Sequence, residues 1–136
     1  MNIISNAVKY NKEKGEILLS YYETQVDDRH ILLEFHCKDT GVGMSKEFQN
    51  HIFEPFTQET GGARSVYGGT GLGMPITKKL IEKMGGTIKF ESEKNVGTTF
   101  MVQLPFLISA DMKQAESQED DVSIEGMRIL LAKTMN

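Results

Sequence analysis

The apolar and polar positions in the first third of the chain follow two periods. Residues 1–10 place apolar side chains on one face at helical spacing and polar side chains opposite, which predicts an amphipathic helix. Residues 16–26 and 30–37 are rich in apolar, β-branched and aromatic residues, and the polar triplet between them is a turn candidate. We therefore expect an N-terminal helix followed by an antiparallel hairpin.

The remainder of the chain repeats both patterns. A short helix is predicted over residues 46–51, and a longer one over 76–84 that ends at a pair of glycines. Residues 87–92 and 98–104 alternate as strands on either side of a turn, and Pro105 should end the sheet. The pattern predicts a second hairpin packed beside a helix.

Two apolar groups are expected to hold the helical layer to the core. Ile76, Leu80 and Met84 form one stripe of the longer helix, with Ile81 beside it. Phe53 and Phe56 lie in a segment too aromatic for a free loop, and we expect both rings to anchor it.

Composition and cysteine content narrow the class of protein. The 136 residues are 39% hydrophobic and 25% charged, as in ordinary soluble globular domains. The single cysteine, Cys37, excludes an internal disulfide and lies in an apolar run, which predicts a buried thiol. The chain contains no apolar run of membrane-spanning length and opens with no signal peptide, so we expect a cytoplasmic location without direct membrane contact.

The net charge of −4 is unevenly spread. Acidic residues concentrate after residue 108, so the body of the chain has no basic field suited to nucleic acid. We expect a globular unit over residues 1–108, an acidic linker over 109–126, and the start of another domain over 127–136.

A glycine cluster at residues 68–73 runs directly into the predicted helix. A helix N-terminus exposes unpaired N–H groups, and glycines let a phosphate approach them. The spacing excludes a P-loop, because no glycine is followed by lysine, and it does not fit a dinucleotide fingerprint. The alternatives are a phosphate-binding turn or a flexible loop, and the glycine-rich, aperiodic residues 57–70 are a candidate mobile lid.

Polar side chains share one face of the N-terminal helix. Asn2, Asn6 and Lys9 recur at spacings of four and three. They are either solvated surface residues or a ligand site in which the Asn6 amide oxygen binds a hard cation such as Mg²⁺.

Asp39 ends the second predicted strand and is followed by Gly41 and Gly43. A carboxylate in this position can accept a hydrogen bond from an exocyclic amine such as that of adenine. The alternative is an Asx turn, for which Asp-Thr-Gly is suitable chemistry.

Taken together, the ordered segments resemble the ATP-binding domain of sensor histidine kinases. Residues 2–10 resemble the asparagine box, 39–44 the first glycine box, 52–56 the phenylalanine box and 69–73 the second glycine box, and 97–100 resemble the last glycine motif. The resemblance covers residues 1 to about 106. It implies an α/β (α+β) two-layer sandwich of the Bergerat type, a mixed sheet covered on one face by helices, here truncated at its N-terminus.

The resemblance also implies the roles of individual residues. Asn6 would bind Mg²⁺, Lys9 would contact phosphate, and Asp39 would accept the adenine amino group. The glycines at 69, 71 and 73 and the following amides would receive the phosphates. The residues assigned to nucleotide binding are Asn2, Asn6, Lys9, Tyr10, Asp39, Gly41, Gly43, Gly69, Thr70, Gly71, Leu72, Gly73, Met74 and Thr98.

The implied activity is transfer of the γ-phosphoryl group of ATP to a histidine of a separate or upstream dimerisation domain, in two-component signalling. His30, His36 and His51 lack the acidic neighbour of the family's acceptor histidine, so we expect them to be structural and the isolated chain not to phosphorylate itself. Residues 127–132 resemble the first strand of a receiver domain, so 127–136 would be its start. A receiver domain and a second copy of the chain are the other expected partners. An ATPase with the same type of site, as in DNA gyrase B, and a noncatalytic nucleotide-binding module remain alternatives.

Overall fold

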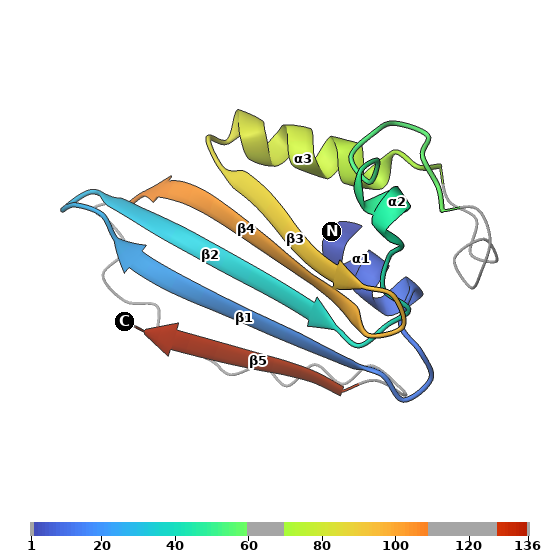
Figure 1. The fold of residues 1–136 in the computed structure, drawn as a ribbon. Helices are drawn as coiled ribbons and strands as arrows, with labels where there is room; N and C mark the ends of the chain where they lie inside the picture. Colours follow the sequence, from blue (N-terminus) through green and yellow to red (C-terminus); the bar gives the residue numbers. More distant parts are fainter. Residues whose placement is uncertain (1, 60–69, 109–127, 136) are drawn as a thin grey trace.

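The computed structural model describes residues 2–59, 70–108 and 128–135. It has two layers, a β-sheet and helices that cover one of its faces (Figure 1). The helices are α1 (Asn2–Lys9), α2 (Lys46–Gln49) and α3 (Gly73–Lys83); the strands are β1 (Glu16–Gln25), β2 (His30–Asp39), β3 (Thr87–Glu93), β4 (Gly97–Leu107) and β5 (Arg128–Met135).

The five strands lie in the order β3-β4-β2-β1-β5. The first four strands of this order, β3, β4, β2 and β1, pair with one another in antiparallel fashion. Strand β5 pairs with β1 in parallel, so the sheet is mixed. The predicted two-layer architecture and both predicted hairpins are confirmed.

The β1–β2 hairpin is closed by its predicted turn. The Asp27 carboxylate accepts hydrogen bonds from the backbone N–H groups of Arg29 at 2.8 Å and His30 at 2.9 Å. These bonds lower the pKa of Asp27 below its ordinary value, with the His30 ring adding to the effect. The turn fixes a register in which Leu19 lies opposite Cys37.

The core lies between the covered face of the sheet and the helices. The strands contribute buried side chains at alternate positions, as a half-buried sheet requires. Ile3 and Ala7 of α1 are buried against them, which confirms the amphipathic helix predicted at the start of the chain. The buried hydrophobic residues are Ile3, Ala7, Ile17, Leu19, Cys37, Met44, Ile52, Met74, Ile81, Phe100 and Val102.

Helix α3 begins earlier and faces the core differently than predicted. It starts at Gly73, so Pro75 lies in the first turn, where its missing N–H costs no intrahelical hydrogen bond. It ends before Gly85, which adopts the left-handed conformation with a φ of +76°. The expected stripe was wrong: Ile76, Leu80 and Met84 are about half exposed. The buried residues of α3 are Met74 and Ile81, and Met74 lies outside the range from which the stripe was derived.

At 11 residues, α3 is the longest of the described helices. Within the described residues, no helix has the length and apolar character needed to cross a bilayer.

The two phenylalanines after α2 behave differently from each other. Phe53 packs edge-on against Phe90, with ring centroids 5.8 Å apart, as an anchor should. The expectation for Phe56 was wrong, because 76% of its surface is exposed. Its backbone has a φ of +62°, which turns the side chain away from the core.

Strand β4 continues through Pro105 to Leu107, so the prediction that the proline ends the sheet was wrong. The N–H of Ile108 donates to Arg29 on the β2 side. Since N–H groups alternate between the two edges of a strand, the ring nitrogen of Pro105 faces the other edge. Strand β3 begins opposite Gln103, so no neighbouring strand needs a donor from Pro105.

The C-terminal strand pattern is realised as β5, which joins the same sheet beside β1. The acidic stretch predicted as a linker lies outside the described residues. The division into a globular unit, a linker and the start of a further domain stays a prediction.

The buried thiol of Cys37 should be chemically inert in the folded chain. The side chain has no exposed surface, and burial, assisted by the negative charge of Asp39, raises its pKa to about 12. A thiol reagent should therefore leave native protein unlabelled near neutral pH and label it fully in denaturant. The pKa of the Cys37 thiol is higher in the folded chain than its ordinary value of 9.0. The thiol therefore favours the folded state at pH values below 9.0, and this contribution to stability is lost as the pH rises toward 12. Rapid stoichiometric labelling of native protein would contradict the burial.

Candidate functional site

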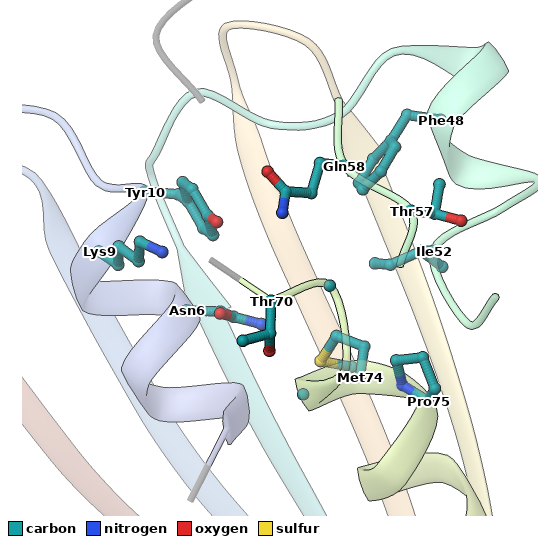
Figure 2. Close-up of a pocket in the computed structure, with 12 residues that line it drawn as sticks. Asn6, Lys9, Tyr10, Phe48, Ile52, Thr57, Gln58, Thr70, Met74 and Pro75 are labelled. Carbon is teal, nitrogen blue, oxygen red and sulfur yellow. The ribbon is translucent and has the colours of Figure 1, made fainter. Parts of the chain in front are cut away.

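The larger of two adjoining cavities opens between α1, the segment after α2 and the start of α3 (Figure 2). Its volume is about 200 Å³. The residues that line it are Asn6, Lys9, Tyr10, Phe48, Ile52, Thr57, Gln58, Thr70, Gly71, Gly73, Met74 and Pro75. Residues from the N-terminal helix and the glycine cluster, which sequence reasoning assigned to one site, therefore surround one cavity.

A smaller cavity of about 20 Å³ lies deeper, against the sheet. It shares Asn6, Tyr10 and Ile52 with the larger one. Asp39 and Thr98, both buried, belong to its lining. The two cavities together bring the predicted carboxylate within the same site as the predicted phosphate-binding turn.

Asp39 is held by the sheet and by the loop that follows it. It is the last residue of β2 and lies opposite Thr98 of β4. Its Oδ1 atom accepts hydrogen bonds from the N–H of Gly41 at 2.8 Å and the N–H of Thr98 at 3.2 Å. The bond from Gly41 is the predicted Asx turn, so this carboxylate takes part in a turn and lines a cavity at once.

The start of α3 presents backbone donors to the larger cavity. Gly71 has a φ of +68°, and Gly73 is the first helical residue. The N-cap residue, Leu72, has an apolar side chain that cannot cap the first turn. The Leu72 N–H makes a long 3.4 Å hydrogen bond to the Thr70 hydroxyl, while the positive end of the helix dipole lies beside the cavity.

The two ends of segment 57–70 meet through their backbones. The N–H of Phe56 donates to the carbonyl of Gly71 at 3.1 Å. A Cβ atom on Gly71 would come within 2.8 Å of the Phe56 Cα atom, so this close approach requires glycine. Gly69 and most of the predicted lid lie outside the described residues.

Asn2 lies away from the larger cavity. Its amide nitrogen donates to the carbonyl of Gly73 and to the hydroxyl of Thr77, both at 2.9 Å. These bonds tie α1 to the first turn of α3. Asn2 thus positions the predicted phosphate-binding turn in this structure, and a direct contact with nucleotide stays a prediction.

Gly41 and Gly43 lie outside both linings and are required by loop packing. A Cβ atom on Gly41 would lie 2.3 Å from the carbonyl oxygen of Tyr10. On Gly43, where φ is +60°, it would lie 1.9 Å from the carbonyl oxygen of Glu93. The glycines let the loop after β2 pack between α1 and the β3–β4 turn, and their contact with a base stays a prediction.

Sequence reasoning missed five residues that line the larger cavity, namely Phe48, Ile52, Thr57, Gln58 and Pro75. Figure 2 shows Gln58 projecting into the cavity opposite Asn6 and Tyr10. The segment has no periodic pattern that marks a binding face. Its one signal was the phenylalanine box, residues 52–56, which includes Ile52 and directly precedes Thr57 and Gln58.

The three histidines lie outside both cavity linings, and each contacts a carboxylate. His30 lies 2.8 Å from Asp27, and His51 lies 3.0 Å from Glu54. His36 contacts Glu34, whose pKa is lowered first by the hydrogen bond from Gln103 and then by His36. These contacts are those of structural and surface residues.

The two adjoining cavities thus lie among an amide-bearing helix, the N-terminus of a glycine-led helix and a buried carboxylate. The family model described as histidine kinase-, DNA gyrase B- and HSP90-like ATPase matches residues 1–108. The chain belongs to this family.

Its curated relatives are histidine kinases. The chain is 45% identical over 104 residues to Histidine protein kinase 1 of Candida albicans, a match that covers 76% of this chain and 4% of the relative. It is 33% identical over 133 residues to the sensor protein EvgS of Escherichia coli, which covers 96% of this chain and 11% of EvgS. The chain thus spans a small part of the length of the curated relatives it matches.

Solved structures of histidine kinases share the fold. Full-length ShkA in complex with AMPPNP superposes with a TM-score of 0.61 at 31% identity, over 80% of this chain and 21% of that one. The catalytic domain of the histidine kinase ThkA gives a TM-score of 0.59 at 28% identity, over 77% of this chain and 62% of that one.

Proposed function

We propose that this chain binds ATP with Mg²⁺ and acts as the catalytic unit of a histidine kinase, donating the γ-phosphoryl group to a histidine on another domain. The observation that carries the proposal is that two adjoining cavities share lining residues, with a buried carboxylate beside the inner one and the N-terminus of α3 beside the outer one. ATP fits a site with an acceptor at one end and positive potential at the other, because the amino group of its base donates hydrogen bonds and its phosphates carry negative charge.

At the inner end, Asp39 is the acceptor for the amino group of adenine. Backbone N–H groups from two different segments hold its Oδ1 atom, which orients the carboxylate before any ligand binds. Tyr10 and Ile52 border both cavities and supply apolar surface for the base.

At the outer end, the start of α3 receives the phosphates. Its dipole and first-turn N–H groups favour an anion, and Lys9 of α1 adds a positive charge to the same cavity. Thr70, Gly71, Gly73 and Met74 of this phosphate-binding turn line the cavity, and Leu72, assigned with them, lies outside its lining.

The residues present fit a magnesium ion held jointly by protein and phosphate. Within the described residues there is no cluster of three or more His, Cys, Asp or Glu side chains that could enclose a metal. Mg²⁺ commonly takes few protein ligands together with phosphate oxygens and water. The Asn6 amide oxygen, on the cavity side of α1, would be such a ligand, and the ion would neutralise charge on the transferring phosphate.

The contribution of the chain to phosphoryl transfer is positioning and electrostatics. The start of α3, Lys9 and Asn6 hold the triphosphate so that its terminal phosphate faces the open side of the cavity, where an imidazole nitrogen can attack in line. The described histidines lie outside the site, so the acceptor comes from an upstream or separate dimerisation domain. The curated relatives include hybrid kinases, which supports a receiver domain as a further partner; a second copy of the chain stays a prediction.

The family also contains ATPases, and the composition of α1 favours the kinase over them. Hydrolysis needs a group that activates water, and the family's ATPases would place an acid on this helix. Helix α1 and the residue after it bring three polar side chains to the cavity: the amide of Asn6, the ammonium of Lys9 and the phenol of Tyr10. None of the three is a carboxylic acid. A noncatalytic nucleotide-binding module is the remaining alternative.

Replacing Asp39 with asparagine should weaken ATP binding while preserving the fold. The asparagine side chain keeps an oxygen for the Asx turn and loses the charge, so we expect the Kd for ATP, measured by calorimetry, to rise about tenfold to a hundredfold. Asp27→Asn is the matched control, because Asp27 lies in the β1–β2 turn outside both cavities. Equal affinity of Asp39→Asn and wild type would refute the assignment of the base site.

Replacing Asn6 with alanine should remove the metal dependence of binding. Wild type should bind ATP more tightly with Mg²⁺ than with a chelator present, and Asn6→Ala should show nearly the same affinity in both conditions because a protein ligand is lost. Asn50→Ala, in the exposed turn after α2, serves as the control. A metal dependence that survives in Asn6→Ala would assign the ion to another residue.

Phosphoryl transfer can be tested with the acceptor supplied separately. The chain is mixed with a histidine-bearing dimerisation domain and ATP labelled on its γ-phosphate, and label should appear on histidine in an acid-labile form. Release of free labelled phosphate without labelled histidine would favour the ATPase. Binding of ATP with neither product would favour the noncatalytic module.

A further inference from the structure

Ser92 of β3 connects three segments beside the inner cavity. It lies opposite Thr98 of β4, and their hydroxyl oxygens are 2.9 Å apart. The N–H of Met44, in the loop after β2, donates to the Ser92 hydroxyl at 2.9 Å. The same hydroxyl lies 3.1 Å from the carbonyl oxygen of Gly97. None of the sequence motifs included Ser92.

The proton count decides which way the Thr98 hydroxyl points. A serine hydroxyl has one proton to donate and two lone pairs to accept with. The Gly97 carbonyl can only accept, so Ser92 spends its proton there and accepts from Met44 with one lone pair. The remaining lone pair can only accept, which makes Thr98 the donor in the bond between the two hydroxyls.

Thr98 consequently presents lone pairs, and no proton, toward the inner cavity. Only 3% of its surface is exposed, and its backbone N–H holds the Asp39 carboxylate at 3.2 Å. The two side chains thus form a pair of acceptors in a cavity of about 20 Å³, room for a group about the size of one water. An amino group carries two protons and fits this pair, whereas a carbonyl oxygen would face lone pairs only.

The backbone of Ser92 is held independently of its hydroxyl. The Gln49 amide donates to the carbonyl oxygens of Met44 and Ser92, both at 3.0 Å. Strand β3 and the loop after β2 therefore stay joined when the Ser92 hydroxyl is removed. The main consequence of its removal is that the direction of the Thr98 hydroxyl proton is no longer fixed.

We propose that Ser92 is a positioning residue that fixes Thr98 as an acceptor and thereby makes the site prefer a purine with a 6-amino group over one with a 6-oxo group. This inference rests on the proposed binding of ATP. Ser92 acts through Thr98 and makes no contact with the nucleotide.

The test compares ATP with inosine triphosphate, which differs by a 6-oxo group, on the full chain by calorimetry. Wild type should bind ATP more tightly. In Ser92→Ala the Thr98 hydroxyl can turn and donate toward the cavity, so the ratio of the two dissociation constants should fall about threefold to tenfold, the value of one hydrogen bond. A purely structural role would weaken both nucleotides alike and leave the ratio unchanged.

A double-mutant cycle isolates the proposed route. Thr98→Val removes the hydroxyl that Ser92 orients, so adding Ser92→Ala to Thr98→Val should not change the ratio further. Thr87→Val, at an exposed position of β3, is the control and should keep the wild-type ratio. Ser92→Cys, which keeps the side-chain size with a weaker acceptor, should lower the ratio too and replaces Ser92→Ala if that variant is unstable.

The outcomes separate the two proposals. If wild type binds neither nucleotide, the proposed function fails. If wild type prefers ATP and Ser92→Ala and Ser92→Cys retain the full preference, the function stands and the positioning role of Ser92 is overturned. An additive effect of Ser92→Ala in the Thr98→Val background would also overturn it.

Discussion

The structure of the site depends on the Asp39 carboxylate and its two backbone donors. One oxygen joins the end of β2, the loop at Gly41 and the start of β4 through bonds of 2.8 and 3.2 Å. Because these donors belong to different segments, the carboxylate lies at a defined point of the inner cavity before a ligand arrives. A buried charge without such bonds would be costly, so the same contacts stabilise the fold and prepare the site.

The outer half of the site depends on how α1 meets α3. Asn2 bonds to Gly73 and Thr77, which sets the first turn of α3 against α1. The Phe56 and Gly71 backbones meet at the other side of that turn. The cavity therefore lies between elements whose relative positions are held by hydrogen bonds, and such positioning is what the proposed phosphoryl transfer would require.

Much of the fold could be predicted because its signals are local. The hairpin turn at Asp27 and the glycine that ends α3 depend on nearby residues and were found as expected. The missed features depend on distant partners. Phe56 turns outward because its backbone pairs with Gly71, and Pro105 is tolerated because β3 has not begun opposite it.

The sequence by itself determined the order of the elements, the identity of the family and the residue types that suit a nucleotide, because hydrophobic period and motif order are properties of the chain. Only the tertiary structure decided which face each residue uses. It placed Asn2 against Gly73, turned Ile76 and Leu80 to solvent, and brought Met44 to Ser92. The reason is physical: a side chain's contacts and the direction of a hydroxyl proton are set by partners that packing brings together, and those partners are far apart in the chain.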